Sequence, residues 1–189
     1  LVRQDYGELF KAHAEAIAAA DPTMTIIAAP WLYREDELDY PENIAPVRQI
    51  LEAARGRNVL WDVHVGGDSL RDADTAERFL GRLRAWLDEL DPDNQVRFCV
   101  LEENGGRHDL QRALGHAHMV NTMERLAGAV VIDCPANCLQ PWEQNDNGWD
   151  QGQLFFTPDQ VWGMPPYYAQ QLIAHHYQPL CIHAESEGD

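Results

Sequence analysis

Short apolar runs alternate with amphipathic stretches along most of the chain. Apolar residues that recur at spacings of three and four predict helices, whereas short apolar runs bounded by polar or turn residues predict strands. The runs that predict strands are residues 25–29, 58–65, 95–101 and 129–133, with a further strand starting within 179–183. The stretches that predict helices are residues 6–20, a helix beginning at 41–42, and residues 74–90, 109–126 and 165–175.

This alternation of strands and helices is typical of βαβ units around a parallel sheet. Such a sheet is either open and doubly wound or closed into a (β/α)8 barrel. An open sheet normally carries a glycine-rich phosphate loop, and neither GxGxxG nor GxxxxGK[ST] occurs in the sequence. We therefore predict an α/β fold of the (β/α)8 TIM-barrel type, of which the four βα units of this chain would form half.

Polar and aromatic side chains gather where the predicted strands end, which is where a barrel enzyme places its chemistry. They are Trp31 and Tyr33 after the first strand, His64 at the end of the second, Glu102 and Glu103 at the end of the third, and Asn137 beyond the fourth.

The adjacent acids Glu102 and Glu103 are candidates for catalysis. A carboxylate at a strand end suits nucleophilic or acid–base work, and retaining glycosidases use two carboxyl groups about 5–5.5 Å apart. Neighbouring residues of an extended strand point to opposite faces, so we expect one catalyst and one supporting group rather than a catalytic pair. The alternative is a solvated acidic loop in which residues 104–106 form the turn.

The histidines and cysteines do not predict a metal site. His116 and His118 are two residues apart and do not share a helix face. A zinc site at Cys134 and Cys138 would need two further ligands, and the cysteines fit small buried hydrophobes instead. We predict no metal and no cofactor, and His64 stays open between a role in the site and a role in packing.

An aromatic-rich stretch at residues 147–168 indicates carbohydrate binding. Rings such as that of Trp149 can stack on sugar faces, and the amides of Gln151 or Gln153 can bind ring hydroxyls. For Phe155 and Phe156 the alternative is a hydrophobic clamp that holds this segment to the rest of the fold.

Composition and charge narrow the class of partner. The chain has 189 residues, enough for one domain with a core, and a net charge of −17. An acidic protein is a poor match for nucleic acid or for an anionic membrane, and no apolar run reaches the roughly 20 residues that span a bilayer. The chain opens on the polar LVRQDYGELF without Met, so we expect it to begin after a cleavage or inside a longer chain.

Several segments resemble glycoside hydrolase family 51, the retaining α-L-arabinofuranosidases. RFCVLEENG, residues 97–105, resembles the family's strand that carries the nucleophile, where a hydrophobic strand ends in Glu, followed by an aromatic residue and often Asn. Residues 109–142 and 152–176 resemble its following helix, strand and Gln–aromatic–Pro segment. Residues 6–29 resemble the helix and strand that come after its Gly-Asn-Glu acid/base motif. The resemblance therefore covers nearly the whole chain.

The resemblance implies a retaining hydrolase that releases arabinose from plant polysaccharides or oligosaccharides by double displacement, with Glu102 as the nucleophile. Asn104 takes the place of the family's Asn, His64 that of a His on the sixth barrel strand, and Gln153 that of a sugar-contacting Gln, with Gln151 as the fallback. The residues expected to bind the carbohydrate substrate are His64, Asn104, Gln153, Gln151, Trp149 and Trp31.

The sequence departs from the family pattern in three ways. DVHVGG offers no Tyr after His64, and Glu103 replaces an aromatic residue, so that we expect Arg107 to compensate its charge as a supporting residue. The acid/base motif is absent and would lie upstream of Leu1.

Residues 1–178 are therefore expected to be the C-terminal half of the barrel, strands five to eight, and residues 179–189 the start of a following segment or a tail. The N-terminal half would come from the same or a companion chain, and we also expect a homo-oligomer. A half barrel alone should bury its sheet poorly and expose an open edge.

Other functions stay open. One is a β-glycan hydrolase of the same type, and another is an inert carbohydrate-binding or structural fragment that lacks the acid/base Glu. A nucleotide-binding α/β protein is disfavoured by the missing phosphate loop. The sugar and its linkage are open, and the acidic composition fits a secreted or a cytoplasmic bacterial enzyme equally well.

Overall fold

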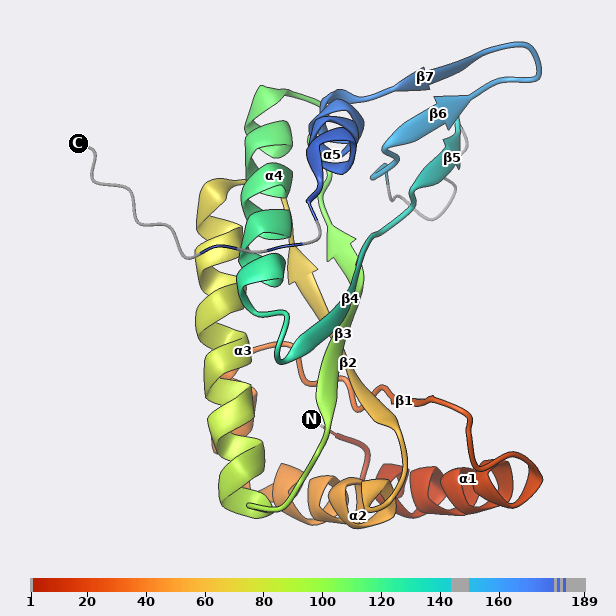
Figure 1. The fold of residues 1–189 in the computed structure, drawn as a ribbon, viewed down its shortest axis with the longest axis vertical. Helices are drawn as coiled ribbons and strands as arrows, with labels where there is room; N and C mark the ends of the chain where they lie inside the picture. The colour runs from red at the N-terminus through yellow and green to blue at the C-terminus, as the bar shows by residue number, and fades with distance from the viewer. Residues whose placement is uncertain (1, 144–149, 179, 181, 183–189) are drawn as a thin grey trace.

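The computed structural model describes residues 2–143, 150–178, 180 and 182 (Figure 1). Its main sheet is parallel, with strands in chain order: β1 (Ile26–Ala28), β2 (Val59–Gly66), β3 (Arg97–Asn104) and β4 (Val130–Pro135). The helices are α1 (Tyr6–Ala20), α2 (Ile44–Ala54), α3 (Leu70–Leu90), α4 (Leu110–Arg125) and α5 (Pro165–His176), with short 3-10 turns η1 (Glu35–Asp39) and η2 (Pro41–Asn43). None of the described helices combines the length and the apolar character needed to cross a bilayer.

The predicted α/β fold with a parallel sheet is confirmed, with shifted boundaries at some elements. The helix expected from residue 41 starts at Ile44, because η2 occupies residues 41–43. The helix expected from residue 74 starts at Leu70, because Ser69 and Asp72 cap its first turn reciprocally. Strand β3 continues to Asn104, so both glutamates lie in the sheet rather than in a loop. The strand expected to start within 179–183 lies largely outside the described residues.

One face of the sheet packs against helices and forms the core. In Figure 1, α3 and α4 run along one side of the strands, and α1 and α2 lie across their lower ends. The strand residues of this core are Trp61, Val63, Val65, Phe98, Val100 and Val130. Their partners include Ile50 of α2, Leu83 and Leu87 of α3, and Met119 of α4. This packing decides which side chains of each strand remain on the other face.

On the opposite face of the sheet, side chains of the two edge strands are exposed to solvent, and side chains of the two central strands are buried. Ile27 of β1 and Ile132 of β4 are 42% and 39% exposed, whereas Leu60 and Cys99 of the central strands are buried. Burial raises the pKa of Cys99 to about 12, and the charges of Asp62 and Cys134 add to the increase. Side chains of β2, β3 and β4 therefore lie close together on this face of the sheet. The expectation of a poorly buried sheet is therefore wrong for the central strands, whose side chains on this face are buried. Whether the chain is half of a closed barrel stays a prediction.

A β-bulge at Leu101 changes which side chains of β3 face the helices. Val100 pairs with Val63, but the next pair is Glu102 with His64, so Leu101 has no counterpart on β2. Strict alternation from the core residue Val100 would turn Glu102 toward the helices. The extra residue reverses that order and places Glu102 beside His64 on the open face.

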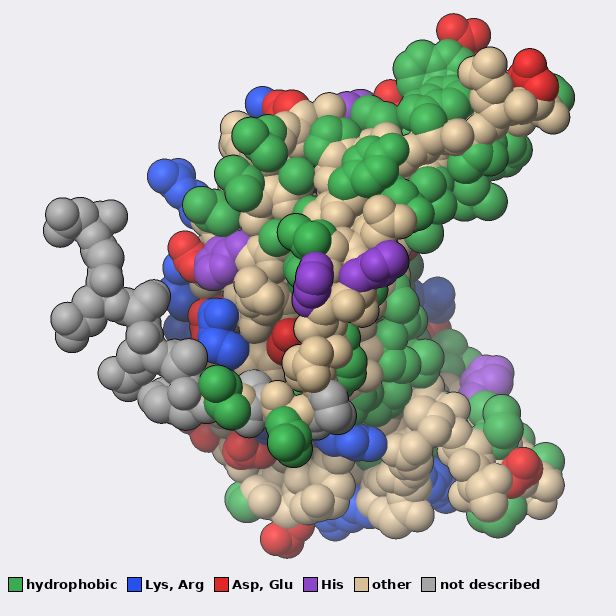
Figure 2. Space-filling model, turned by 45° about the horizontal axis from the view of Figure 1, so that its top comes forward, with side chains coloured by type: hydrophobic (Ala, Val, Ile, Leu, Met, Phe, Trp, Pro, Cys, Tyr) green, Lys and Arg blue, Asp and Glu red, His purple; other side chains and the backbone are tan. Residues whose placement is uncertain are grey.

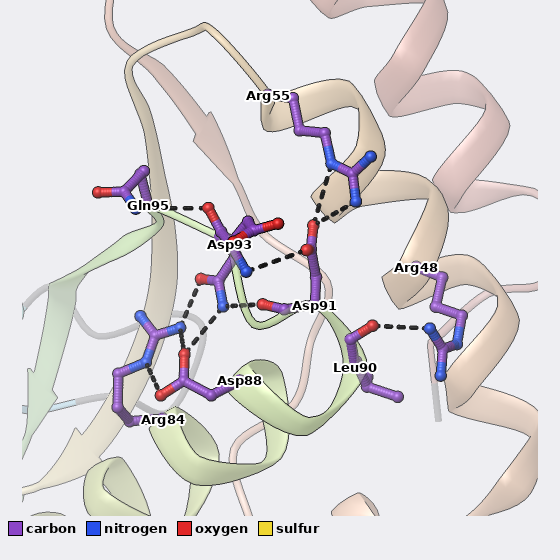
Figure 3. Close-up of polar contacts among 9 residues, drawn as sticks. Arg48, Arg55, Arg84, Asp88, Leu90, Asp91, Asp93 and Gln95 are labelled. Atoms are coloured by element: carbon purple, nitrogen blue, oxygen red, sulfur yellow. Dashed lines mark hydrogen bonds and ion pairs between the residues drawn. The ribbon is translucent and has the colours of Figure 1, made fainter.

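A hydrogen-bonded network closes the end of the sheet where the strands begin (Figure 3). Arg55, after α2, forms a 3.0 Å ion pair with Asp91, after α3, and Asn94 Nδ2 donates to the Asp91 carbonyl at 2.7 Å. Arg48 of α2 donates to the carbonyl of Leu90 at 2.6 Å. These bonds hold two helix ends together at the end of the sheet away from the candidate site, the end that in barrels serves stability.

A second, small sheet was not predicted. It contains β5 (Leu139–Pro141), β6 (Leu154–Phe156) and β7 (Val161–Gly163) and forms an arm that projects beside the main sheet (Figure 1). Its buried Phe155 contacts Trp142, Trp162 and His108 through their rings, which agrees with the clamp expected for this residue. Figure 2 shows hydrophobic side chains gathered on this arm.

The contact of α4 with the start of α3 can be tested at Gly115. A Cβ at Gly115 would lie 2.6 Å from the Ser69 backbone nitrogen, which cannot move aside cheaply. Gly115→Ala is expected to lower the free energy of unfolding by about 1–3 kcal/mol in urea titrations followed by circular dichroism. Gly81→Ala, on α3 with open space around it, is the control and is expected to raise stability by about 0.5–1 kcal/mol. Equal stability of the two variants would contradict the packing described here.

Candidate active site

An open cavity of about 400 Å³ lies at the C-terminal ends of β3 and β4. The described residues that line it are Leu101, Glu102, Asn104, Pro135, Ala136, Asn137 and Gln151. Three predicted site residues, Glu102, Asn104 and Gln151, therefore meet at one cavity. Of the described lining residues, Glu102 is the single acid.

Glu102 presents a carboxylate that is accessible yet held by neighbours. Its side chain is 42% exposed, and its Oε2 lies 3.2 Å from Nδ1 of His64. Asn104 Nδ2 donates to the same oxygen at 3.3 Å. A solvent-accessible carboxylate oriented by two polar neighbours can act as a nucleophile toward a bound electrophile.

His64 is fixed between a buried acid and an aromatic ring. Its Nε2 lies 3.0 Å from Oδ2 of Asp62, and the ring of Tyr33 stacks on the imidazole at 4.4 Å with planes 13° apart. Trp31 is 65% exposed, and its ring centroid lies 6.4 Å from that of His64. The backbone of Trp31 has a φ of 63°, a left-handed conformation that a bulky residue rarely adopts outside strained or functional sites.

Asp62 was not identified from the sequence, and Tyr33 was named only among the residues at the strand ends, without a role in the site. The spacing of Asp62 and His64 by two residues already places them on one face of a strand. Tyr33 comes from the segment after β1 and stacks on His64. Burial and then the charges of Asp62 and Glu102 raise the pKa of Tyr33, so the phenol adjoins this pair.

Glu103 points toward α4, on the face of the sheet opposite to Glu102, as expected for adjacent residues of a strand. It is 3% exposed, and its oxygens lie 2.7 and 2.8 Å from Nδ1 of His116 on α4. Burial raises the pKa of Glu103. Burial alone would lower the pKa of His116, but the hydrogen bond to Glu103 and its charge outweigh it and raise that pKa.

The compensation expected from Arg107 is wrong. The guanidinium of Arg107 forms an exposed ion pair with Asp109, two residues on, because the chain turns outward before α4. The cations that counter Glu103 are His116 and Arg112, whose Nη2 donates to the carbonyl of Gln151 at 2.8 Å. The charge of Glu103 is thus matched by a histidine on the facing helix.

The two candidate glutamines occupy different places. Gln151 lines the cavity, and its Oε1 accepts a hydrogen bond from the Gly105 N–H at 3.2 Å. Gln153 is 1% exposed, and its Nε2 lies 3.3 Å from Nε2 of His116. It is not among the described residues that line the cavity. The fallback residue Gln151 therefore has the better access to a ligand. Trp149 lies outside the described residues.

Asp133 of β4 adds a second acid, after Glu103, on the helix side of the sheet. Its Oδ1 is buried without a hydrogen-bond partner among the described residues. Burial and then the charge of Glu103 raise its pKa to about 7, against the opposing effect of His116. Within the described part of the chain, no three His, Cys, Asp or Glu side chains are arranged to hold a metal ion.

The raised pKa of Asp133 predicts that replacing its carboxyl increases the stability of the fold at high pH but not at low pH. The folded protein holds this proton more tightly than the unfolded chain, whose reference pKa is 3.8. The associated stability is therefore present at low pH and is lost as the pH rises toward 7. Asp133→Asn is expected to change the free energy of unfolding little at pH 4 and to raise it by about 1–3 kcal/mol at pH 8.

Urea titrations at the two pH values measure this effect. Asp93→Asn, at an exposed position, is the matched control and should show no comparable difference between pH 4 and pH 8. A loss of stability at pH 8 in Asp133→Asn would contradict the account.

Comparison with solved structures places this fold among known ones. Over 92% of its length the chain is similar to a family 51 α-L-arabinofuranosidase from Bifidobacterium longum, with a TM-score of 0.69 and 10% identity. Over 90% of its length it is similar to the GH51 arabinofuranosidase from Xanthomonas axonopodis pv. citri, with a TM-score of 0.64 and 12% identity. The chain covers 41% and 39% of these proteins, about two fifths of their length.

No family model and no curated protein sequence matches the chain. The likeness therefore concerns the fold. The α/β structure with a parallel sheet corresponds to part of a GH51 arabinofuranosidase structure.

Proposed function

We propose that the chain supplies the nucleophile of a retaining glycoside hydrolase that acts on α-L-arabinofuranosides. The observation that carries the proposal is the accessible Glu102 carboxylate at the end of β3, on a polar cavity with Asn104 and beside His64. The fold likeness to GH51 arabinofuranosidases supports the choice of reaction and sugar. Fold likeness alone does not establish activity, which makes the chemistry of Glu102 the deciding point.

In the proposed reaction, Glu102 attacks the anomeric carbon while the bond to the leaving oxygen breaks, giving a glycosyl ester on the carboxylate. Water then attacks the same carbon, the ester bond breaks, and the sugar leaves with its configuration retained. Asn104 and Gln151, which line the cavity, are proposed to hydrogen-bond the sugar hydroxyls. The exposed ring of Trp31 is proposed to stack on a face of the sugar.

The acid/base carboxyl is proposed to come from outside this chain. Retaining enzymes need a second carboxyl about 5–5.5 Å from the nucleophile, and Glu103 points away from the cavity toward His116. The N-terminal half of a barrel, in the same or a companion chain, would pair with edge strands β1 and β4. The exposed Ile27 and Ile132 on those strands support this arrangement.

A carbohydrate-binding fragment without catalysis is the second candidate. It is favoured by the single acid among the described cavity-lining residues. A β-glycan hydrolase of the same mechanism differs from the leading proposal only in the sugar that it would accept.

Covalent trapping tests the proposal. The chain is incubated with an aryl α-L-arabinofuranoside whose leaving group is good enough to depart without acid assistance, and intact mass is recorded. We expect a pentosyl adduct that peptide mapping assigns to Glu102, and no adduct in Glu102→Gln. Glu15→Gln, an exposed substitution on α1, is the control and should label like the unmodified chain.

Other outcomes redirect the assignment. An adduct that survives Glu102→Gln would refute Glu102 as the nucleophile. An adduct formed only with an aryl β-glycoside would support the β-glycan hydrolase instead. Binding of the arabinofuranoside without any adduct would support the non-catalytic fragment.

A further inference from the structure

A buried arginine connects α4 and the loop before it to the segment that carries Gln151. Arg112 of α4 is 2% exposed, and its guanidinium donates to two backbone carbonyls. Nη2 donates to the carbonyl of Gln151 at 2.8 Å, and Nη1 donates to the carbonyl of Arg107 at 3.2 Å. Arg107 belongs to the loop between β3 and α4, whereas Gln151 lies in the segment that precedes β6. One side chain thus links two segments that are distant in the sequence.

The side-chain amide of Gln151 is held by the same loop. Its Oε1 accepts a hydrogen bond from the Gly105 N–H at 3.2 Å. Because a backbone N–H only donates, this contact requires the oxygen of the amide, and not its amino group, to face the loop. No described group accepts a hydrogen bond from Nε2, and Nε2 is not among the buried polar atoms without a partner. The amino group is therefore open to the cavity that Gln151 lines.

Gly105 is the point at which the loop backbone packs against the guanidinium. A Cβ at Gly105 would lie 2.7 Å from Nε of Arg112 and 2.9 Å from Oδ1 of Asp68. Asp68 in turn holds the next two residues of the loop. Its carboxylate accepts hydrogen bonds from the N–H of Gly106 at 3.2 Å and from the N–H of Arg107 at 3.0 Å. A side chain at position 105 would therefore displace the groups that hold the loop.

The charge of Arg112 does not by itself explain these contacts. Burial lowers the pKa of Arg112, and the charges of Asp68, Glu103 and Asp150 counter that effect. A lysine would also supply a cation to these carboxylates. The two carbonyls, however, are bound by two separate nitrogens of one planar group, and a lysine has a single nitrogen that cannot occupy both positions.

We propose that Arg112 is a positioning residue that holds the Gln151 carbonyl against the loop before α4, keeps Gln151 Oε1 on the Gly105 N–H, and so directs the Gln151 amino group into the cavity. A ligand at this position must then offer a hydrogen-bond acceptor, which the oxygen of a sugar hydroxyl does. The consequence for sugar binding rests on the proposed function, whereas the orientation of Gln151 does not.

Hydrogen exchange of glycine amides tests this role without a ligand. Selective ¹⁵N-glycine labelling reports on Gly105 and also on Gly152, whose N–H donates to Oε1 of Gln140 at 2.9 Å. Each signal is assigned by its loss in the corresponding glycine-to-alanine variant. In Arg112→Lys we expect the Gly105 amide to exchange about tenfold faster, as for the loss of one hydrogen bond. The Gly152 amide should exchange as it does in the unmodified chain, because its bond does not involve Arg112.

Two outcomes of the exchange experiment would overturn the proposal. Unchanged exchange at Gly105 in Arg112→Lys would show that a cation alone is sufficient at this position. Equal acceleration at Gly105 and Gly152 would show that the whole segment has loosened and that the effect is not specific to Gln151. Gln151→Ala removes the acceptor of the Gly105 N–H and is the positive control, in which Gly105 should exchange faster.

A matched pair of substitutions in the loop gives a second test. Gly105→Ala should push the guanidinium of Arg112 aside, whereas a Cβ at Gly106 meets nothing within 4 Å. The readout is the side-chain amide signal of Gln151, which is assigned by its disappearance in Gln151→Ala. The signal should move in Gly105→Ala and in Arg112→Lys, and stay in place in Gly106→Ala. A signal that moves in neither of the first two variants, or equally in all three, would refute the proposal.

Ligand binding separates the positioning role from the proposed function. Methyl α-L-arabinofuranoside is titrated into each chain and followed by the same spectra. We expect Arg112→Lys to bind it about tenfold more weakly than the unmodified chain, and Gly106→Ala to bind it equally well. Equal affinity of Arg112→Lys and the unmodified chain would refute the role of Arg112 in the site. Absence of binding by the unmodified chain would count against the proposed function, and the exchange of Gly105 would still decide whether Arg112 orients Gln151.

Discussion

The packing of β2 and β3 against the helices is the constraint on which the rest of the structure depends. Trp61, Val63, Phe98 and Val100 must face α3 and α4 to form the core, and this leaves their neighbours on the open face. Up to Val100 the strands obey simple alternation. The bulge at Leu101 then reverses the order, so that Glu102 joins His64 on the open face and Glu103 turns toward α4.

An acid–histidine pair results on each face of the main sheet. Glu103 and His116 belong to the helix side, where Asp133 adjoins them, and Asp62 and His64 belong to the open side next to Glu102. Because Glu102 and Glu103 are adjacent residues of β3, the backbone of this strand fixes the separation of these two acids.

The sequence predicts the main elements because their signals are local. Hydrophobic periodicity correctly predicted both ends of α1, and the short apolar runs predicted the four strands of the main sheet. The earlier start of α3 was also readable, since Ser69 and Asp72 stand at capping-box spacing. The strands of the second sheet, three residues each, are too short to leave a periodic signal.

The site was less predictable because it depends on contacts between distant segments. No local pattern reveals that His116 rather than Arg107 neutralises Glu103, since the choice follows from how α4 packs on the sheet. The bulge has no glycine to mark it, and Tyr33 reaches His64 only because β1 and β2 are neighbours. The grouping of Glu102, Asn104 and Gln151 is likewise a property of the folded chain.

The bulge also has a consequence for the way this strand can change during evolution. Loss of Leu101 would leave Glu102 directly after Val100, so plain alternation would still present Glu102 to the open face. Pairing of the same residues without the bulge would instead turn Glu102 toward α4 and present Glu103 to the open face. An acid would stand at the strand end in either frame, but it would be a different one with different neighbours. The identity of the presented carboxylate thus depends on the register of β3 against β2 as well as on its composition, and loss of the bulge at constant length would expose that dependence.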